Sequence, residues 1–306
     1  MTPGRLTRIV TEKKTPPLAV VTVTYSPGDF LTRFLDSLAA ATTRGTLTVL
    51  ADNGSTDGAP EAAAQRRSGV EFLATGGNLG YGSGMNAGAR HLRARREAGE
   101  IDPEFFLVSN PDVEFGPGAI DELLACARRL PSAAAVGPRI REPDGSIYPS
   151  ARAVPTVGNG VGHALFSRVW PGNPWSRAYR QAEDMDAERT AGWLSGSCLL
   201  VRWEAFDAVG GFDERYFMYL EDVDLGDRFT RAGYDNVYCP AAEITHAQGH
   251  ATENHSQAML PAHHASAYSF QADRLSAWWQ APVRWALRAG LKARAAAAIA
   301  LTRRSV

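Results

Sequence analysis

"LAVVTVTY", residues 18–25, is an almost continuous run of apolar and β-branched residues. Such a run is typical of a strand that is buried on both faces, as the strands of a parallel sheet are. The segment that follows, residues 28–41, carries apolar residues at helical spacing. Together the two segments predict the first strand and the first helix of an α/β domain.

The same pattern of strand followed by helix recurs along the first half of the chain. Further strands are expected at 47–53, 70–75, 104–110 and 133–140, and further helices at 59–67, 84–96 and 117–130. Alternation of this kind implies right-handed crossovers, and hence a doubly wound, mostly parallel sheet. Ligands bind such sheets beyond the carboxyl ends of the strands. The polar residues that follow three of the strands therefore predict a ligand site: Thr24, Tyr25, Asp52, Asn53, Asn110 and Asp112.

The alternation stops after residue 140. A hairpin with its turn at Asp144–Gly145 is expected next, and the aperiodic stretch 151–190 is typical of a functional loop. The remaining expected elements are a strand at 197–203, a short helix at 219–234 and a helical, basic segment over 258–306. We therefore expect a flexible N-terminus over 1–16, one domain over 17–257 that divides near residue 140, and the C-terminal segment as an appendage.

Composition and charge argue against several classes of protein. The 306 residues carry a formal net charge of −1, whereas nucleic-acid binding leaves a strongly basic footprint. The three cysteines form no CxxC pair, which argues against a disulfide framework and a zinc ribbon and suits a reducing compartment. Residues 1–17 lack the apolar core of a signal peptide, and no run of about 18 apolar residues predicts a membrane-spanning helix. The cytoplasm is the expected location.

Two acidic segments are candidates for chemistry. Asp112 follows a predicted strand directly behind Pro111. A single carboxylate there caps a helix more often than it binds a metal, yet a divalent cation that also holds a diphosphate needs only one or two protein ligands. In "YFMYLEDVDLGDR", residues 216–228, a helix dipole explains Glu221 and Asp222 but not the aromatic residues before them. Apolar surroundings raise a carboxyl pKa towards the range of a general base.

Two loops carry weaker signals. "ADNGSTDG", residues 51–58, contains residues that commonly serve turns and helix caps, but Asp52 is also placed to accept the imide N–H of a pyrimidine base. "GGNLGYGSGMNAGA", residues 76–89, fits neither the dinucleotide-binding nor the Walker pattern of glycines. It is either a flexible loop or a place where the backbone approaches a ligand ahead of a helix. His246 and His250 lack the HExxH pattern of a metalloprotease.

Together, and in this order, these segments resemble the family 2 inverting glycosyltransferases, which have the GT-A fold, over about residues 18–250. "GNLGYGSGMNAG" is similar to the stretch N-x-G-[FY]-[AG]-x-[GA]-x-N of the rhamnosyltransferase-like branch, and "NPDVEF" occupies the place of the DxD metal motif. The resemblance implies donor contacts at Thr24, Tyr25, Asp52, Asn53, Asn78, Gly80, Tyr81, Gly82, Asn86 and Asn110. It also implies a Mn²⁺ or Mg²⁺ ion on Asp112 and on His246, which follows Asp222 along the chain.

The resemblance further implies a reaction. Asp222, with Glu221 beside it, deprotonates an acceptor hydroxyl, which displaces a nucleoside diphosphate in one inverting step. The half 17–140 binds the nucleotide, and the half 141–257 binds the acceptor through Trp193, Ser195, Gly196 and Asp224. The implied donor is dTDP-L-rhamnose, and the implied acceptor is a glycan or polyprenyl-diphospho-GlcNAc of bacterial cell-wall linker-unit biosynthesis. A UDP-sugar donor stays open, because thymine and uracil present the same edge to Asp52.

Two other classes of protein stay open from the residues alone. A sugar-1-phosphate nucleotidyltransferase would need a basic, glycine-rich loop after the first strand, where this chain has "TYSPGDF". A binding module without activity would not need the acids and the histidine that are retained here. Donor hydrolysis in the presence of Mn²⁺ or Mg²⁺ distinguishes these classes from a transferase.

The C-terminal segment suits an anionic membrane surface. It carries three tryptophans, Trp278, Trp279 and Trp285, and the basic residues Arg284, Arg288, Lys292, Arg294, Arg303 and Arg304. A peripheral contact with the inner face of the cell membrane is one expectation. A helix packed on the catalytic domain, or on a second copy in a homo-oligomer, is the alternative.

Overall fold

The computed structural model describes residues 15–156, 184–247 and 256–304. In the first half, strands and helices alternate as β1 (Leu18–Thr24), α1 (Asp29–Ala41), β2 (Thr46–Asp52), α2 (Ala59–Arg66), β3 (Val70–Ala74), α3 (Tyr81–Glu97) and β4 (Phe105–Ser109). Next come β5 (Val113–Phe115), α4 (Ala119–Arg129), β6 (Ala133–Arg141), β7 (Ile147–Tyr148), β8 (Ala151–Arg152), β9 (Arg189–Ala191) and β10 (Trp193–Leu194). The last elements are β11 (Cys198–Arg202), α7 (Trp203–Ala208), α8 (Glu221–Arg231), β12 (Asp235–His246), α10 (Ser256–Arg274), η1 (Trp278–Gln280) and α11 (Ala281–Arg304).

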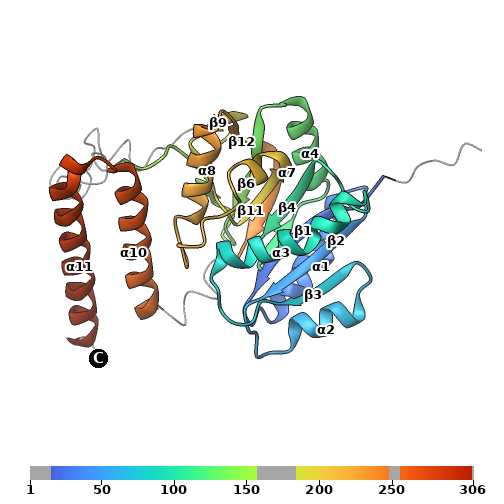
Figure 1. Cartoon of the computed structure of the whole chain (residues 1–306). Coiled ribbons are helices and arrows are strands. Elements are labelled where there is room, and N and C mark those ends of the chain that lie inside the picture. The colour runs from blue at the N-terminus through green and yellow to red at the C-terminus, as the bar shows by residue number, and fades with distance from the viewer. Residues whose placement is uncertain (1–14, 157–183, 248–255, 305–306) are drawn as a thin grey trace, which may run out of the picture.

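One large sheet runs through the molecule, with helices on both of its faces (Figure 1). Its main path is β3-β2-β1-β4-β11-β6-β12-β5. Strands β1 to β4 are parallel to one another, and β6 and β12 are parallel as well. β11 is antiparallel to both of its neighbours, β4 and β6. The prediction of a doubly wound, mostly parallel sheet is confirmed, with β11 and the short edge strand β5 as the reversed members of this path.

The two faces of the sheet carry separate hydrophobic cores. Leu18 and Val20 of β1 pack with α1 and α4 on one face, and Ala19 and Val21 pack with α3, α7 and α8 on the other. All four side chains are fully buried, which explains the continuous apolar run at the start of the chain. Full burial of a side chain such as Leu18 stabilises the fold by about 1.5–3 kcal/mol.

Helix α3 begins at Tyr81, three residues before the predicted start, and two of its glycines, Gly84 and Gly88, face strand β1. A Cβ at Gly84 would lie 2.6 Å from Cγ2 of Val23, and a Cβ at Gly88 would lie 2.3 Å from Cγ1 of Val21. Larger side chains would therefore push the helix away from β1. The glycine-rich sequence is explained in part by close packing of this helix on the central strand.

Strand β12 was not predicted, because Pro240 interrupts its apolar pattern and proline is rare inside sheets. Register shifts between Cys239 and Glu243 accommodate the proline, and the strand then continues to His246. His246 thus ends a strand, whereas the sequence placed it in a loop. His250, His255 and most of the predicted loop 151–190 lie outside the described residues.

The C-terminal segment forms two long helices, α10 and α11, which lie side by side at one end of the molecule (Figure 1). The chain turns between them at η1, which holds two of the three tryptophans. Among the described residues, the helices are all too short or too polar to cross a bilayer. Phe270 of α10 is fully buried against Tyr216 and Val223, so α10 packs directly beside the start of α8.

Candidate active site

Asp52 is buried at the carboxyl end of β2, and its carboxylate holds the loop that follows. It accepts hydrogen bonds from Oγ1 of Thr24 (2.7 Å) and from the backbone N–H groups of Gly54 (3.0 Å) and Ser55 (2.9 Å), as well as from the hydroxyl of Ser55. A carboxylate offers about four lone-pair positions. Asp52 therefore shapes the loop from within, while the ring of Tyr25 is 45% exposed beside the same strand end.

Asn53 and Asn78 fix the turn that leads into α3. The side-chain N–H of Asn53 donates to the carbonyl of Gly80 (3.0 Å), and Oδ1 of Asn78 accepts from the backbone N–H of Gly80 (3.1 Å). Gly80 has φ +84°, and a Cβ there would lie 2.1 Å from the carbonyl oxygen of Phe217. Only glycine fits this turn, which brings the donor-side loop against the acidic segment of the second half.

Asn86, expected at the donor, is buried and fastens the loop before α8. Its amide nitrogen donates to the carbonyl of Phe212 (2.8 Å) and to Oε1 of Glu214 (3.1 Å), and its oxygen accepts from the N–H of Phe212 (2.9 Å). Gly82 lies one turn earlier, where a Cβ would meet Cβ of Phe212 at 2.9 Å. Both residues join α3 to the second half of the chain through protein contacts.

Asp112 and His246, the predicted metal ligands, come together with Asn110, which was predicted as a donor contact. Nε2 of His246 lies 3.1 Å from Oδ1 of Asp112 and 3.2 Å from Nδ2 of Asn110. Pairing of β5 with β12 sets His246 opposite Val113, which explains how residues far apart in the chain meet. The side chains of Asp112 and His246 are 17% and 13% exposed, so the pair is accessible from one side.

The donor set of this cluster fits a divalent cation. One ring nitrogen presents either a hydrogen or a lone pair, so Nε2 of His246 cannot donate to Asp112 and accept from Asn110 at the same time. With the proton on Nδ1, the lone pairs of the imidazole and of the Asp112 carboxylate point into the same space. With the Asn110 amide turned over, its oxygen would join them. Carboxylate, amide oxygen and imidazole are ligands that Mn²⁺ accepts.

Glu221 and Asp222 form the first turn of α8. Oδ2 of Asp222 accepts from the backbone N–H of Gly196 (3.0 Å), and Oδ1 accepts from the N–H of Val223 (2.8 Å). Glu221 is buried, and its Oε2 has no hydrogen-bond partner among the described residues. Burial, and then the charge of Asp222, raise the pKa of Glu221, and burial also raises the pKa of Asp222. Carboxylates with raised pKa values are suited to proton transfer near neutral pH.

The two residues before these acids are in a left-handed conformation. Tyr219 has φ +67° and Leu220 has φ +64°, which costs about 1–3 kcal/mol for each residue with a bulky side chain. Helix α10 supports the segment, because Oγ of Ser266 donates to the carbonyl of Met218 (2.8 Å) and His263 contacts the ring of Tyr219. Such strain is characteristic of functional sites, and here it sets the start of α8 at Glu221.

Tyr81 connects the metal end of the site to the acids. Its hydroxyl donates to the carbonyl of Gly196, the residue whose N–H holds Asp222. Burial raises the pKa of Tyr81, and the charges of Glu221, Asp222 and Asp112 add to the effect. The backbone N–H of Asn110 donates to the carbonyl of Ser197 (2.9 Å), and the neighbouring Gly196 holds Asp222, so the two predicted clusters meet at residues 196–197.

The other residues predicted to bind the acceptor, Asp224, Ser195 and Trp193, each contact another group of the protein. Asp224 is buried, and its carboxylate pairs with Nε of Arg228 at 2.7 Å, so it supports α8 from within. Oγ of Ser195 lies 3.1 Å from Oγ of Ser197 next to Gly196. The indole N–H of Trp193 donates to the carbonyl of Ala153 (3.1 Å).

Arg152 and Tyr148, which the sequence did not single out, lie next to Asp222. The guanidinium group of Arg152 stacks over the ring of Tyr148 (5.4 Å) and over the ring of Trp193 (5.8 Å). Its positive charge opposes the effect of burial on the pKa of Asp222. The only signal for Arg152 was its place in the aperiodic stretch 151–190, and Tyr148 lies in the predicted hairpin, which the structure confirms as β6 and β7.

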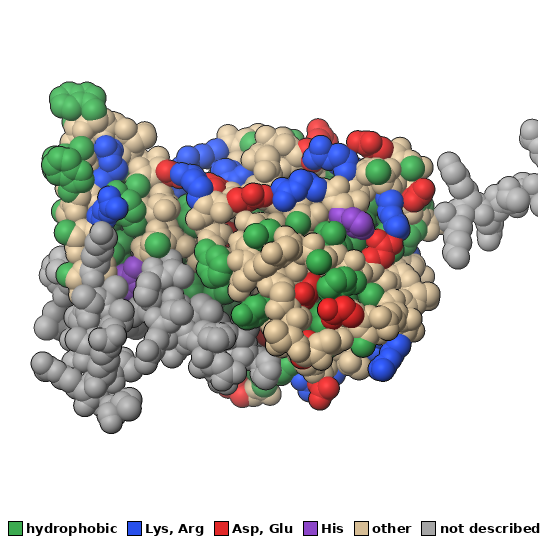
Figure 2. All heavy atoms as spheres, turned by 60° about the horizontal axis from the view of Figure 1, so that its bottom comes forward, with side chains coloured by type: hydrophobic (Ala, Val, Ile, Leu, Met, Phe, Trp, Pro, Cys, Tyr) green, Lys and Arg blue, Asp and Glu red, His purple; other side chains and the backbone are tan. Residues whose placement is uncertain are grey.

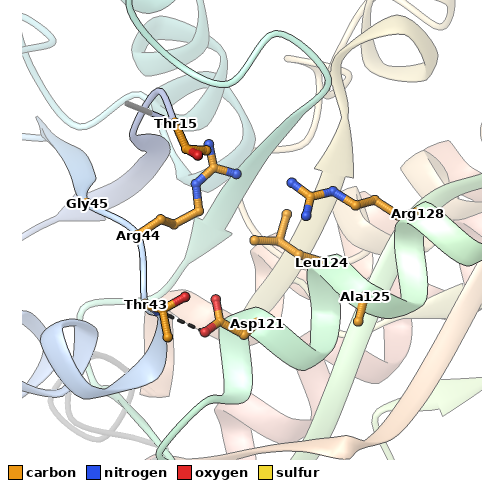
Figure 3. A pocket seen from close by; sticks show the side chains of 8 residues that line it. All are labelled: Thr15, Thr43, Arg44, Gly45, Asp121, Leu124, Ala125 and Arg128. Carbon is orange, nitrogen blue, oxygen red and sulfur yellow. Dashed lines mark hydrogen bonds between the residues drawn. The ribbon is translucent and has the colours of Figure 1, made fainter. Parts of the chain in front are cut away.

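A cavity of about 580 Å³ lies elsewhere, between α4 and the loop before β2 (Figure 3). The side chains of Arg44 and Arg128 point into it, and the N–H of Thr43 donates to Asp121 at its edge (2.8 Å). It opens where β1 and β2 begin, whereas Asp52, Asp112 and His246 lie at or just beyond the ends of strands. None of the predicted site residues lines it.

Comparison with known proteins shows the family to which the chain belongs. The model of the family "Glycosyl transferase family 2" matches residues 19–210. The chain is 55% identical over 280 residues to N-acetylglucosaminyl-diphospho-decaprenol L-rhamnosyltransferase of Mycobacterium tuberculosis (strain H37Rv), covering 90% of this chain and 91% of that protein. It is 26% identical over 190 residues to rhamnosyltransferase WbbL of Escherichia coli (strain K12), covering 61% of this chain and 67% of that protein.

Solved structures share the fold at low sequence identity. GalNAc-T7, crystallised with UDP, GalNAc and Mn²⁺, superposes with a TM-score of 0.53 at 15% identity, over 77% of this chain and 44% of that chain. Residues 1–349 of S. aureus TarS superpose with a TM-score of 0.53 at 14% identity, over 91% of this chain and 80% of that chain. At these identities the likeness concerns the fold alone.

The family match excludes the two alternatives that the residues left open, a sugar-1-phosphate nucleotidyltransferase and an inactive binding module. The chain belongs to glycosyl transferase family 2, and it is a glycosyltransferase with the GT-A fold.

Proposed function

We propose that this enzyme transfers L-rhamnose from dTDP-L-rhamnose to a hydroxyl of polyprenyl-diphospho-GlcNAc, with inversion, in the synthesis of a cell-wall polysaccharide. The observation that carries the transfer chemistry is the meeting of two clusters at residues 196–197: Asp112 with His246, and Glu221 with Asp222. The 55% identity to the mycobacterial rhamnosyltransferase supports the choice of donor and acceptor.

In this proposal Asp112 and His246, with the amide oxygen of Asn110, hold Mn²⁺ or Mg²⁺. The cation supplies positive charge that stabilises the diphosphate leaving group. Neutral imidazole and ionised carboxylate are the forms that bind metal. The site therefore requires both side chains in their deprotonated forms.

Asp222 is the proposed general base. The N–H groups of Gly196 and Val223 hold its two oxygens, so the carboxylate has a fixed orientation towards an incoming hydroxyl. Its raised pKa increases its strength as a base. A single displacement on the face opposite the nucleotide inverts the anomeric centre. Glu221 is buried beside Asp222, whose charge raises the pKa of Glu221, and is the second proposed catalytic residue.

The donor nucleotide is proposed to lie along the ends of β1 and β2. The exposed ring of Tyr25 offers a surface on which a pyrimidine can stack, and Asp52 and Asn53 shape the loop beside it. The turn at Asn78 and Gly80 closes the other side. Thymine and uracil present the same imide edge, so contacts to that edge do not select dTDP over UDP.

The domain division follows from the same geometry. We assign residues 17–140 to donor binding, 141–257 to acceptor binding and 258–306 to a C-terminal helical unit. Hydrophobic side chains gather on this unit (Figure 2), where Trp278, Trp279 and Trp285 are 86%, 65% and 72% exposed. A lipid-linked acceptor resides in a membrane, and exposed tryptophans favour its interface.

Two of the basic residues of the C-terminal unit, Arg284 and Arg288, have described contacts within the protein. Arg284 donates to the carbonyls of Leu275 and Ala277, and Arg288 stacks over Tyr268 at 5.5 Å. The side chains of Lys292, Arg294, Arg303 and Arg304 lie outside the described ones. We therefore propose that membrane contact rests mainly on the tryptophans, at the inner face of the cell membrane.

The full-length protein, incubated with Mn²⁺, radiolabelled dTDP-L-rhamnose and a short-chain polyprenyl-diphospho-GlcNAc, tests the proposal. We expect one rhamnose per acceptor by mass spectrometry, with the inverted anomer by NMR. UDP-glucose and UDP-galactose serve as competing donors, and GlcNAc-1-phosphate serves as an acceptor without lipid. Efficient transfer from a UDP-sugar, with none from dTDP-L-rhamnose, would contradict the proposed donor.

A further inference from the structure

We propose that Cys126, Glu188 and Cys239 form a second metal site, for a soft divalent cation of the zinc class. Cys126 lies on α4, Cys239 lies on β12, and Glu188 comes directly before β9. The two sulfur atoms and a carboxylate oxygen all lie within 4.8 Å of one another. Pairing of β9 with β12 and packing of α4 on β12 bring the three residues together.

The spacing of the three ligand atoms suits tetrahedral coordination. Sγ of Cys126 lies 3.5 Å from Oε2 of Glu188. Metal–ligand bonds of about 2.3 Å to sulfur and about 2.1 Å to oxygen place tetrahedral ligands about 3.6–3.8 Å apart. A small inward movement of the side chains would therefore complete the site, and one water molecule would take the fourth position.

The charges in the cluster stay balanced when a dication replaces the two thiol protons. Nη1 and Nη2 of Arg129 hold both oxygens of Glu188, at 3.1 and 2.8 Å. Two thiolates, one carboxylate and one guanidinium group carry a net charge of −2, which a zinc ion cancels. Binding would release the two thiol protons to solvent. Thiolate ligands also favour zinc over Mn²⁺ and Mg²⁺, so this site is chemically distinct from the one at Asp112 and His246.

An ion can reach the cluster from the surface. Cys126 and Cys239 are buried, but Glu188 is exposed and lines a hollow of about 210 Å³ with Leu130 and Val237. Bound zinc would join α4 to β12, the strand that carries His246 at its end. The expected consequence is a more stable second half of the sheet.

Cobalt(II) is the probe that reports sulfur ligands directly. The full-length protein, purified with a reductant and freed of metal by chelation, should bind one equivalent of Co²⁺ with a thiolate charge-transfer band in the near ultraviolet. Zn²⁺ should displace it, and Mn²⁺ should not. Cys126→Ser and Cys239→Ser should abolish the band, whereas Cys198→Ser, a buried thiol outside the cluster, should retain it. Glu188→Gln should weaken Co²⁺ binding at least tenfold.

Glu188→Gln keeps the test decisive if the buried cysteine variants fail to fold, because Glu188 is exposed. Zn²⁺ should raise the melting temperature of the wild type and of Cys198→Ser by mass action, and that of Glu188→Gln much less. Co²⁺ binding without a charge-transfer band, or equal affinity in Glu188→Gln, would overturn the proposal. So would a thiol titration of the denatured protein that finds Cys126 and Cys239 joined as a disulfide.

Discussion

Oδ1 of Asp112 lies 3.1 Å from Nε2 of His246, although the two residues are 134 positions apart in the chain. Strands β5 and β12 meet antiparallel at the edge of the sheet, and their pairing sets the distance between the two side chains. The carboxylate of one segment and the imidazole of another therefore form a preorganised pair. The first prediction concerns this pair.

Asp112→Asn should lower the rate of sugar transfer roughly 10²–10³-fold at saturating Mn²⁺, because an amide replaces the anionic ligand of the cation. The measurement is kcat, together with the shift of melting temperature that donor and Mn²⁺ produce jointly. Asp36→Asn, an exposed acid on α1 paired with Arg67, is the matched control and should behave as the wild type. An active Asp112→Asn enzyme would show that the cation is held elsewhere.

Asp222→Asn should lower the transfer rate by roughly 10²–10⁴-fold while donor affinity changes little, because the variant lacks only the base. Calorimetry of donor binding and kcat measured on the same preparation separate the two effects. Asp227→Asn is the control: this acid lies on the same helix and pairs with Arg231 and Arg274. Transfer at the wild-type rate by Asp222→Asn would rule out the assignment.

Glu221→Gln should stabilise the protein at pH values above about 4–5, the ordinary range of carboxyl pKa values. Because the folded-state pKa of Glu221 is raised, the folded protein binds its proton more tightly than the unfolded chain does. Ionisation therefore costs stability as pH rises, and the neutral amide avoids a cost of about 1–3 kcal/mol. Melting curves at pH 5 and pH 8 should show a larger gain at pH 8. An equal gain at pH 5 and pH 8 would mean that folding does not raise the pKa of Glu221.

Arg152→Gln should move the acidic limb of the pH–rate profile to higher pH, because the guanidinium charge lowers the pKa of the Asp222 carboxylate. Arg152→Lys keeps the charge and should leave the limb nearly in place. The same variants should raise KM for a diphosphate-bearing acceptor more than for an uncharged GlcNAc glycoside, since Arg152 is the cation beside the base. A profile that does not move in Arg152→Gln would place this charge too far from Asp222 to matter.

Replacing Trp278, Trp279 and Trp285 with alanine should weaken the affinity for anionic vesicles at least tenfold in sedimentation, because the variant lacks the exposed rings that would insert at the lipid interface. Transfer to a water-soluble acceptor should be unaffected. Leu79→Ala, an exposed apolar residue of the donor half, is the control. Equal vesicle binding by all three proteins, together with a change of oligomeric state in the tryptophan variant, would favour a second copy of the chain as the partner.

The sequence predicted the first half of the fold well because each segment there carries its own signal. The run at 18–25 is apolar on both faces since two cores meet on β1, and α1 shows a clear helical period. Strand β12 has no such signal: Pro240 breaks its pattern, and its conformation depends on partners from β5, β6 and β9. Pairing across the chain cannot be read from local periodicity.

The site shows the same division. Its acids were visible because Glu221 and Asp222 follow an unusual aromatic segment, and the resemblance to family 2 connected Asp112 with His246. The sequence did not predict the roles of residues whose side chains bond to other parts of the protein. The Asn86 amide bonds to the loop at Phe212, and Asp224 pairs with Arg228, whose spacing of four residues was a signal that could have been used.

The hydrogen bond from Ser266 to the carbonyl of Met218 has a practical consequence for anyone who trims this protein. A fragment that ends after residue 257 contains every proposed catalytic side chain but lacks the helix that braces Tyr219 and Leu220 in their unfavourable geometry. In such a fragment Tyr219 and Leu220 can leave the left-handed conformation, which would change the orientation of Asp222. Shortened versions designed for easier crystallisation would then be expected to bind nucleotide normally and turn over slowly, and an inactive fragment would say little about the intact enzyme.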